Sequence, residues 1–365
     1  MATLHEIIRA LETLAPPGLQ ESYDNAGLIT GNNEQEVTGI LVCLDSTEAV
    51  LDEAIAKGCN LIVAHHPIVF SGLKKITGRN YVERVIIKAI RNNIALYAIH
   101  TNLDNVYQGV NLRFADTLGL QHTRILAPMK GKLRKLVTFV PEAQAETVRE
   151  AICKAGAGNI GNYSDCTFNV SGTGTFKAGE QATPFAGKKG EIHREAEVRI
   201  ETIYPIWVEN EVLKALRTSH PYEEIAYDIY PLENQLQSVG AGLIGQLPAP
   251  VNTIDFLDHV KSVMKTGSIR HTALIKSEIK SVAICGGSGS FLLENAIRAG
   301  ADIFISSDFK YHQFFDADGK IIIADIGHFE TEQFTINLLT EYLSRKFTTF
   351  AVRLTDTNTN PIYYR

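Results

Sequence analysis

Two histidines stand side by side directly after an apolar run. His65 and His66 follow residues 60–64, which read as a buried strand, and they precede Pro67. Pro67 favours an extended backbone at His66, so both imidazoles can leave the strand and face one pocket. Imidazoles placed in this way suit metal ligation or proton transfer. The alternative for an isolated pair is two ordinary polar loop residues.

A second polar cluster follows the next apolar run, residues 94–99. It contains His100 and Asp104. The two oxygens of Asp104 can bind one metal ion or bridge two. His100 can act as a ligand, as a proton carrier or as a group that orients a ligand. Taken alone, an aspartate after a strand is also typical of a helix N-cap.

A third cluster opens the last predicted helix. His328 and Glu332 are four residues apart, so on a helix they share one face and can reach one cation. Glu330 points to another side, where it can stabilise the helix N-terminus or carry a proton. A solvent-exposed pair is the alternative for His328 and Glu332.

The elements that must position these residues follow an α/β pattern at both ends of the chain. The predicted strands are residues 39–44, 60–64, 94–99, 281–285, 301–306 and 321–325, and the predicted helices are residues 47–57, 81–92, 291–299 and 330–345. Continuous apolar strands joined by helices indicate parallel pairing with both sheet faces covered. We therefore expect one largely parallel sheet formed by both terminal segments.

The middle of the chain has a different order of elements. The predicted strands there are residues 132–140, 166–170, 195–201 and 223–230, and the predicted helices are residues 143–155 and 209–218. This β-α-β-β-α-β order is the split βαβ arrangement of ferredoxin-like α+β folds. We predict a discontinuous α/β domain of residues 1–128 and 236–365, interrupted by an inserted domain of residues 129–235. A chain of 365 residues is long enough for two domains.

The carboxyl ends of parallel strands meet at one edge of a sheet, so the three polar clusters are expected to converge there. The predicted metal ligands are His65, His66, Asp104, His328 and Glu332. Because one catalytic zinc usually takes three protein ligands, five ligands indicate two divalent ions, roughly 3.5–4 Å apart. The nitrogen and oxygen ligands suit Zn, Fe, Mn or Co better than Ca or Mg.

Other polar residues fall near the same edge. Asp308, Lys310 and His312 follow the strand at residues 301–306 and can bind substrate or carry protons, or form a solvated turn. Asp24 and Asn25 can reach the pocket or form a simple turn.

Two glycine-rich runs have open interpretations. Residues 285–290 join a strand to a helix, where they can bind phosphate or allow tight packing, but they lack the lysine of a P-loop. Residues 171–179 read as a hairpin within the insert.

Composition narrows the function classes. Apolar residues make up 45% of the chain and charged residues 21%, and the net charge of −6 argues against nucleic acid as a partner. The five cysteines are scattered without a C-x-x-C pair, so we expect reduced thiols. No secretory leader and no apolar run of about 20 residues stand out, so we expect a cytoplasmic protein with no membrane partner.

Six motifs occur together in a specific order. They are Asp24-Asn25, His65-His66-Pro67, His100-Thr-Asn-Leu-Asp104, Gly286-Gly-Ser-Gly289, Ser307-Asp-Phe-Lys-Tyr-His312 and Gly327-His-Phe-Glu-Thr-Glu332. Together they resemble the bacterial GTP cyclohydrolase 1 type 2 homologues, the NGG-one-interacting-factor-three-like family. The resemblance places the family's two-metal ligands on the five residues chosen above. Ser307 departs from the glycine usual there, a change that can tighten the turn.

The resemblance also carries expectations for the insert and the assembly. The stretch from His220 to Ile225, His-Pro-Tyr-Glu-Glu-Ile, is similar to a characteristic stretch of the PII and CutA-like trimeric domains. The long form of the family implies a homohexamer of two stacked trimers, with the metal sites facing an internal cavity.

Two functions follow as hypotheses. The first is a metal-dependent hydrolase of a small molecule or nucleotide, nominally GTP from the family name. Its catalytic residues would be His100, Glu330 and His312, and its substrate-binding residues would be Asp24, Asn25, Asp308 and Lys310. The alternative is a non-catalytic protein that carries or senses metal or a metal cofactor.

Overall fold

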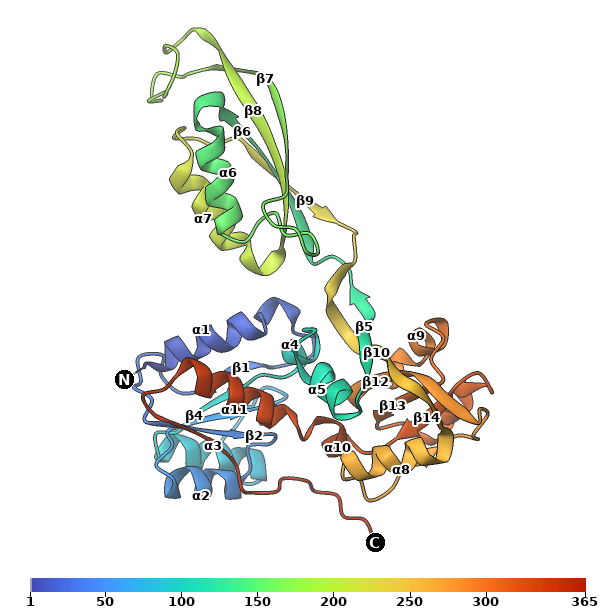
Figure 1. Ribbon diagram of the computed structural model, residues 1–365. Coiled ribbons are helices and arrows are strands. Elements are labelled where there is room, and N and C mark those ends of the chain that lie inside the picture. The colour runs from blue at the N-terminus through green and yellow to red at the C-terminus, as the bar shows by residue number, and fades with distance from the viewer. Residues whose placement is uncertain (1) are drawn as a thin grey trace. The chain divides into compact units, whose positions relative to one another are not determined.

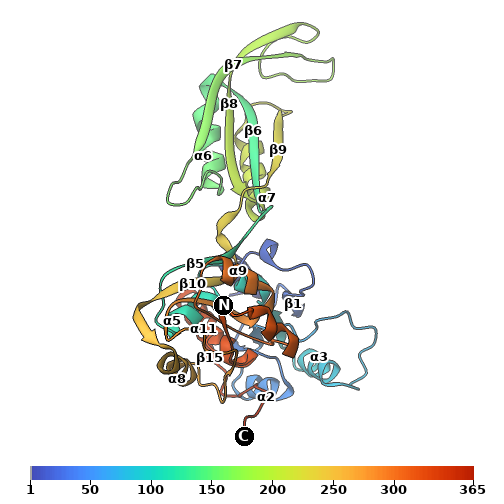
Figure 2. The same cartoon turned by 90° about the vertical axis from the view of Figure 1, so that its right-hand side faces the viewer.

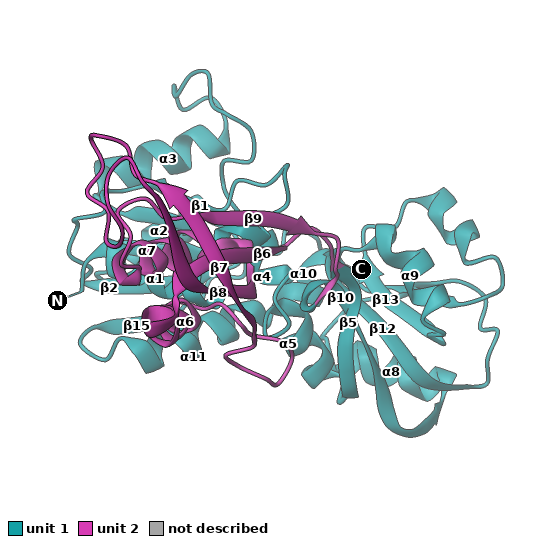
Figure 3. Cartoon of the chain, turned by 90° about the horizontal axis from the view of Figure 1, so that it is seen from above, with its two compact units in different colours: residues 1–128, 237–365 teal, residues 129–236 magenta. Residues whose placement is uncertain are grey.

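The chain divides into two compact units, shown in separate colours in Figure 3. The computed structural model describes residues 2–365. Unit 1 combines the chain up to Pro128 with Gln237–Arg365, and unit 2 is Met129–Leu236. Each unit has a hydrophobic core of its own.

The first sheet of unit 1 is mostly parallel. Its strands in spatial order are β1 (Gly27–Thr30), β4 (Ala95–Ala98), β3 (Leu61–Ala64), β2 (Gly39–Cys43) and β15 (Ala351–Leu354). Strand β1 runs antiparallel to β4, and the other pairings are parallel. The C-terminal segment therefore supplies one edge, β15, to a sheet otherwise built by the N-terminal segment.

The second sheet of unit 1 is mixed. Its strands in spatial order are β11 (Arg270–His271), β14 (Ile322–Asp325), β13 (Ile303–Ser307), β12 (Glu278–Ser288), β10 (Leu236–Asn252) and β5 (Gln121–Met129). Strands β12, β13 and β14 are parallel, while β10 is antiparallel to β12 and β11 is antiparallel to β14. Here the N-terminal segment supplies the edge strand β5.

The expectation of one sheet built by both segments is therefore wrong, because there are two sheets. The predicted strands form the parallel centres of these sheets, and β1, β5, β10, β11 and β15 were not predicted. Central strands buried on both faces are similarly apolar, so their composition does not say which of them pair. The edge strands β5 and β15 pair with partners far away along the chain, which no local pattern indicates.

Helices cover both faces of the first sheet (Figure 1). They are α1 (Leu4–Leu14), α2 (Glu48–Ala56), α3 (Tyr81–Arg91) and α11 (Thr335–Lys346). Helices α1 and α11 pack on one face with Val42 and Val63, and α2 and α3 pack on the other with Leu41 and Ile62. Neighbouring residues of a strand point to opposite faces of the sheet. Because helices cover both faces here, the strands are apolar at consecutive positions.

The second sheet is covered in the same way. The elements are α5 (Val110–Thr117), α8 (Thr253–Val263), α9 (Leu293–Arg298) and the 3-10 helix η5 (Tyr311–Ala317). Helices α5 and α8 pack with Ile303 and Ile305 on one face, and α9 and η5 pack with Phe304 on the other. Two short helices, α4 (Thr101–Asp104) and α10 (His328–Glu332), follow β4 and β14 directly.

Unit 2 has the predicted β-α-β-β-α-β order. Its elements are β6 (Leu133–Pro141), α6 (Ala145–Lys154), β7 (Thr167–Lys177), β8 (Ile192–Pro205), α7 (Glu209–Ser219) and β9 (Tyr227–Leu232). The sheet is antiparallel, with β7 and β9 as its outer strands (Figure 2). Both helices pack on one face, against Leu136 and Tyr204. The second glycine-rich run lies mostly within β7 rather than forming the turn.

Two further observations bear on the expectations from composition. Within residues 2–365, no helix combines the length and apolarity needed to span a membrane. The five cysteines are free thiols, and all but Cys166 are buried.

Candidate metal centre

The five predicted ligands lie together in unit 1, and four of them line one cavity. They come from the ends of both sheets: His65 and His66 follow β3, Asp104 ends α4, and His328 and Glu332 lie on α10. The cavity has a volume of about 690 Å³, and His66, His100, Asp104, His328 and Glu332 are among its lining residues. Asp104 is the last residue of α4 and not its N-cap, so the helix-cap alternative does not hold.

The Glu332 carboxylate lies at the centre of the cluster. Its Oε2 lies 2.9 Å from Nε2 of His66 and 3.2 Å from Nε2 of His328. Its Oε1 lies 3.7 Å from Nε2 of His65, and that nitrogen is 3.6 Å from Oδ1 of Asp104. Two ligand groups therefore share Glu332: one with His65 and Asp104, the other with His66 and His328. A third possible group joins His65, His66 and His100.

Two of these atoms are buried without a hydrogen-bond partner in the part of the chain that the structure describes. They are Nε2 of His65 and Oδ1 of Asp104. A buried polar atom without a partner costs roughly 1–3 kcal/mol, so proteins rarely keep one without a reason. An imidazole lone pair and a carboxylate oxygen that face each other at 3.6 Å are a suitable pair of ligands for a divalent cation. The residues fit a metal ion at this position.

The imidazoles are held in one orientation. Each turns its Nδ1 to an oxygen: His65 to the Ile99 carbonyl at 2.8 Å, His66 to Asp45 at 2.8 Å, His100 to Asp24 at 2.7 Å and His328 to Asp308 at 2.6 Å. A carbonyl only accepts, so Nδ1 of His65 donates, and the lone pair is left on Nε2, the nitrogen near Asp104 and Glu332. Partners of this kind orient metal-binding histidines and raise their basicity.

The first glycine-rich run packs against the cluster. A Cβ on Gly287, whose φ is +61°, would lie 2.4 Å from Oε1 of Glu332. The N–H of Gly286 donates to Asn111, and that of Gly287 donates to Thr331. These two amides are therefore not available to bind a phosphate. Of the two interpretations of residues 285–290, tight packing describes what these glycines do.

Burial determines the protonation states of His65 and Asp104. Burial lowers the pKa of His65, whose side chain is inaccessible to solvent, and keeps the ring neutral. Burial also raises the pKa of Asp104 well above its usual range, and the neighbouring Glu332 carboxylate raises it further. Repulsion from Glu332 thus disfavours the ionised form of Asp104, and a metal ion held by these residues would favour that form.

The pKa values of His66 and His328 are raised, whereas that of His65 is lowered. Burial opposes the charged form of His66, but Glu332 and Asp45 outweigh it and raise the pKa of His66 to about 10. In the same way, Glu332 and Asp308 raise the pKa of His328 to about 11. Burial opposes the ionised form of Glu332, yet the two imidazolium groups keep its pKa low. In the absence of metal, protons on His66 and His328 balance the Glu332 charge.

The predicted substrate-binding residues are placed differently. Asp24 accepts hydrogen bonds from His100 and Thr101, and Asp308 accepts one from His328. Asn25 donates from its side chain to the Val69 carbonyl at 2.6 Å. These three side chains therefore already have partners within the protein.

Three of the predicted site residues do not line the cavity: Lys310 and the proposed proton carriers His312 and Glu330. Lys310 and His312 are exposed and are not among the residues that line the cavity, and the His312 ring packs on Tyr311 and Phe315. Glu330 is buried and accepts a hydrogen bond from Asn360 at 3.2 Å. Of the three predicted proton carriers, only His100 lines the cavity.

Sequence reasoning missed two parts of the site. Asp45, which orients His66, follows β2 directly, so the strand-end pattern that singled out His65 also applied to it. The segment Asn360, Pro361 and Ile362 also lines the cavity, and Thr359 just before it donates to Asp45 at 2.8 Å. No local pattern marked this segment, because only the folded chain brings it to the site.

Known proteins with similar sequences and structures place this arrangement in context. A family model described as Duf34/NIF3 (NGG1p interacting factor 3) matches residues 2–361. The chain belongs to this family. A Halalkalibacterium halodurans relative named "GTP cyclohydrolase 1 type 2 homolog" is 43% identical over 325 residues, 88% of this chain and 87% of the relative. A Bacillus subtilis relative of the same name is 38% identical over 369 residues, 98% of each chain.

A solved structure extends the likeness to the fold of this family member. The crystal structure of a Bacillus cereus protein related to NIF3 has a TM-score of 0.86 and 39% sequence identity. The match covers 100% of this chain and 99% of the Bacillus cereus chain. The family resemblance inferred from the motifs is thereby confirmed.

A Gly287→Ala substitution tests whether the glycine keeps space for the Glu332 carboxylate. We expect metal affinity to fall about 10- to 100-fold, because the new methyl group would displace a shared ligand. Metal content after dialysis, measured by elemental analysis, reports the effect. Gly300→Ala is the control, because Gly300 also has a positive φ, +75°, but has open space around its Cβ position. Equal metal loss in both variants would contradict the prediction.

Metal affinity should increase with pH. Below the raised pKa values of His66 and His328, about 10 and 11, the metal-free protein holds a proton on each ring, and the metal-bound protein holds neither. Raising the pH favours the state with fewer protons, so affinity should rise up to about a hundredfold per pH unit near neutrality. Competition with a chelator of known pH dependence would measure this. An affinity that stays constant between pH 6 and pH 8 would contradict it.

Proposed function

We propose that this protein binds two divalent metal ions in the unit 1 cavity and uses them for hydrolysis. The observation that carries the proposal is the Glu332 carboxylate, which two groups of possible ligands share. His65, Asp104 and Glu332 would hold one ion, and His66, His328 and Glu332 would hold the other. The ligand chemistry suits Zn, Fe, Mn or Co.

The protein residues would contribute positioning and proton transfer. When bound, such ions would lower the pKa of a water molecule and polarise the substrate. His100 lies beside the proposed ligands, with its ring centroid 5.3 Å from that of His65 and 5.4 Å from that of His66. Asp24 fixes Nδ1 of His100, which leaves the opposite nitrogen to move a proton. Burial opposes ionisation of Asp24, but hydrogen bonds from His100 and Thr101 lower its pKa to about 2.

The cavity suits a planar substrate of moderate size. Its volume is typical of small-molecule sites, and the aromatic side chains of Tyr23, Phe70 and Phe291 line it beside the proposed ligands. Such rings can stack on a heterocycle. The relatives' name, "GTP cyclohydrolase 1 type 2 homolog", makes hydrolysis of a guanine nucleotide the nominal activity to test. We propose Asp24 and Asp308 as groups that position histidines rather than as direct substrate ligands.

A non-catalytic metal carrier is the second candidate, because the two groups differ in accessibility. The His65 side chain has no exposed surface, whereas that of His328 is 36% exposed. An ion held by His328 and His66 would be the easier one to exchange with a partner. This difference supports metal delivery or metal sensing as the alternative to hydrolysis.

His100→Ala separates the two candidates. For a hydrolase we expect turnover to fall about 10²- to 10⁴-fold with unchanged metal content, because a proton carrier is lost while the proposed ligands remain. The assay would use metal-loaded protein with GTP and a panel of phosphoesters, with His259→Ala as an exposed histidine control. If fully loaded native protein turns over none of these substrates but transfers metal to an acceptor, the carrier replaces the hydrolase.

We also propose that the two units correspond to a discontinuous metal-binding domain and an inserted PII/CutA-like domain. The compact units and the antiparallel βαββαβ topology of unit 2 support this division. The family resemblance further suggests a homohexamer of two stacked trimers.

Multi-angle light scattering tests the proposed assembly. A hexamer would have a mass of about six times the 40.2 kDa of one chain, and the mass should hold across a tenfold dilution if the assembly is stable. A mass of one or three chains would contradict the proposed assembly.

A further inference from the structure

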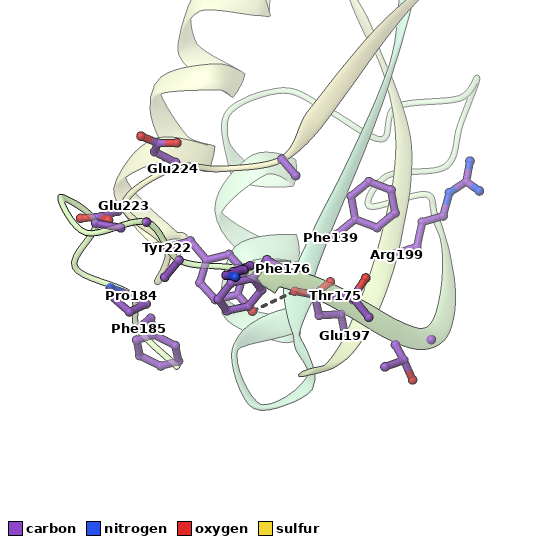
Figure 4. A pocket seen from close by; sticks show the side chains of 18 of the residues that line it. Phe139, Thr175, Phe176, Pro184, Phe185, Glu197, Arg199, Tyr222, Glu223 and Glu224 are labelled. Atoms are coloured by element: carbon purple, nitrogen blue, oxygen red, sulfur yellow. Dashed lines mark hydrogen bonds between the residues drawn. The ribbon is translucent and has the colours of Figure 1, made fainter. Parts of the chain in front are cut away.

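Unit 2 contains a second cavity that takes no part in the metal centre. Its volume is about 620 Å³, and it lies against β7, beside Phe139 of β6, Glu197 of β8 and the stretch Tyr222–Glu224 (Figure 4). All of its lining residues belong to unit 2. The cavity therefore involves residues of the stretch beginning at His220, which the sequence singled out and the proposed metal chemistry does not use.

Aromatic rings form part of its wall. The Tyr222 ring lies 6.0 Å from the Phe176 ring and 6.1 Å from the Phe185 ring, measured between centroids, and Phe139 also lines the cavity. His220 helps to fix this arrangement, because it donates from Nε2 to the Phe139 carbonyl and accepts at Nδ1 from the Tyr222 N–H. These contacts keep the Tyr222 segment in place beside the cavity.

A carboxylate without a cationic partner lies among these rings. The Tyr222 hydroxyl donates to Oε1 of Glu197 at 2.8 Å, the bond dashed in Figure 4. In the part of the chain that the structure describes, Glu197 forms no ion pair, although its neighbours on β8 do. Glu195 pairs with His193 at 2.7 Å, and Arg199, which also lines the cavity, pairs with Glu201 at 2.7 Å. Among the described residues, Glu197 is thus a carboxylate of the cavity wall that has no ion-pair partner.

Gly174 allows the carboxylate to lie there. A Cβ at this position would be 2.0 Å from Oε2 of Glu197 and 2.4 Å from its Cδ. Any other residue would displace the Glu197 side chain from its place across β7. The glycine in this strand therefore has a steric role, although glycine in a strand interior normally weakens the strand.

Other charged residues also line the cavity. Glu223 and Glu224 line it, and Glu223 accepts a hydrogen bond from the Thr183 N–H at 2.6 Å, which holds the loop after β7. The lining cations are Arg199, which is already paired, and Lys177. Three lining carboxylates against these two cations leave the cavity with a negative charge.

We propose that this cavity binds a small organic cation, a quaternary or protonated amine. Aromatic faces attract such cations, and desolvation inside a cavity strengthens the attraction. Glu197 would supply the opposite charge beside Tyr222 and Phe176. A simple metal ion fits less well, because the wall offers rings rather than several converging oxygen or nitrogen ligands.

Calorimetric titration of the full-length protein with choline tests the proposal. We expect saturable binding, and we expect the neutral tert-butyl analogue, in which carbon replaces nitrogen, to bind at least about tenfold more weakly. The analogue has the same shape without the charge, so the comparison isolates recognition of the cation. No saturable choline binding, or equal affinity for both compounds, would overturn the proposal.

Variants then place the binding at this cavity. Glu197→Gln keeps a group that accepts the Tyr222 hydrogen bond but removes the charge, and we expect choline affinity to fall at least about tenfold. Gly174→Ala should give a similar loss by displacing the carboxylate. Glu195→Gln, two residues earlier on β8, is the matched control and should bind normally.

The variants also carry a clear negative outcome. Unchanged choline binding by both Glu197→Gln and Gly174→Ala would overturn the assignment to this cavity. Circular dichroism and metal content confirm that each variant is folded. If either variant fails to fold, the other variant and the neutral analogue on the native protein still decide the question.

Discussion

The Glu332 carboxylate is the contact on which the rest of unit 1 depends. It lies beside the imidazoles of His66 and His328, which follow strands of two different sheets. One buried anion therefore joins the ends of both sheets, and it requires positive charge nearby to remain ionised. Protons on the histidines meet this requirement without metal, and a pair of cations would meet it with metal. The charge balance of one side chain thus couples the fold to the proposed function.

The surroundings of the cluster limit how it can move. Each histidine at the cavity is held through Nδ1, and Gly287 leaves only enough space for the Glu332 carboxylate. Asp45 contacts both His66 and Thr359, so the same carboxylate orients a proposed ligand and anchors the C-terminal segment that lines the cavity. A site held in this way loses little entropy when an ion binds, which favours affinity and a defined geometry.

The two cavities of the chain use carboxylates differently. In unit 1, Glu332 lies among imidazoles that can exchange protons for metal ions. In unit 2, Glu197 lies among phenyl and phenol rings, which do not ionise near neutral pH and offer their faces instead. In both places a glycine, Gly287 or Gly174, gives the carboxylate its space. In each unit, a residue without a side chain thus allows a carboxylate to lie close to the backbone. The neighbours of that carboxylate are imidazoles in unit 1 and aromatic rings in unit 2.

The sequence alone determined which histidines and carboxylates cluster as possible metal ligands. His65, Asp104 and Glu332 lie shortly after the strands β3, β4 and β14, whose apolar patterns are local, so their common placement could be predicted. Only the tertiary structure decided that the strands form two sheets, that Asp24 positions a histidine, and that Lys310 and His312 lie away from the cavity. Pairing between distant segments and the direction of a loop side chain depend on contacts across the fold, and these leave no periodic signal in the sequence.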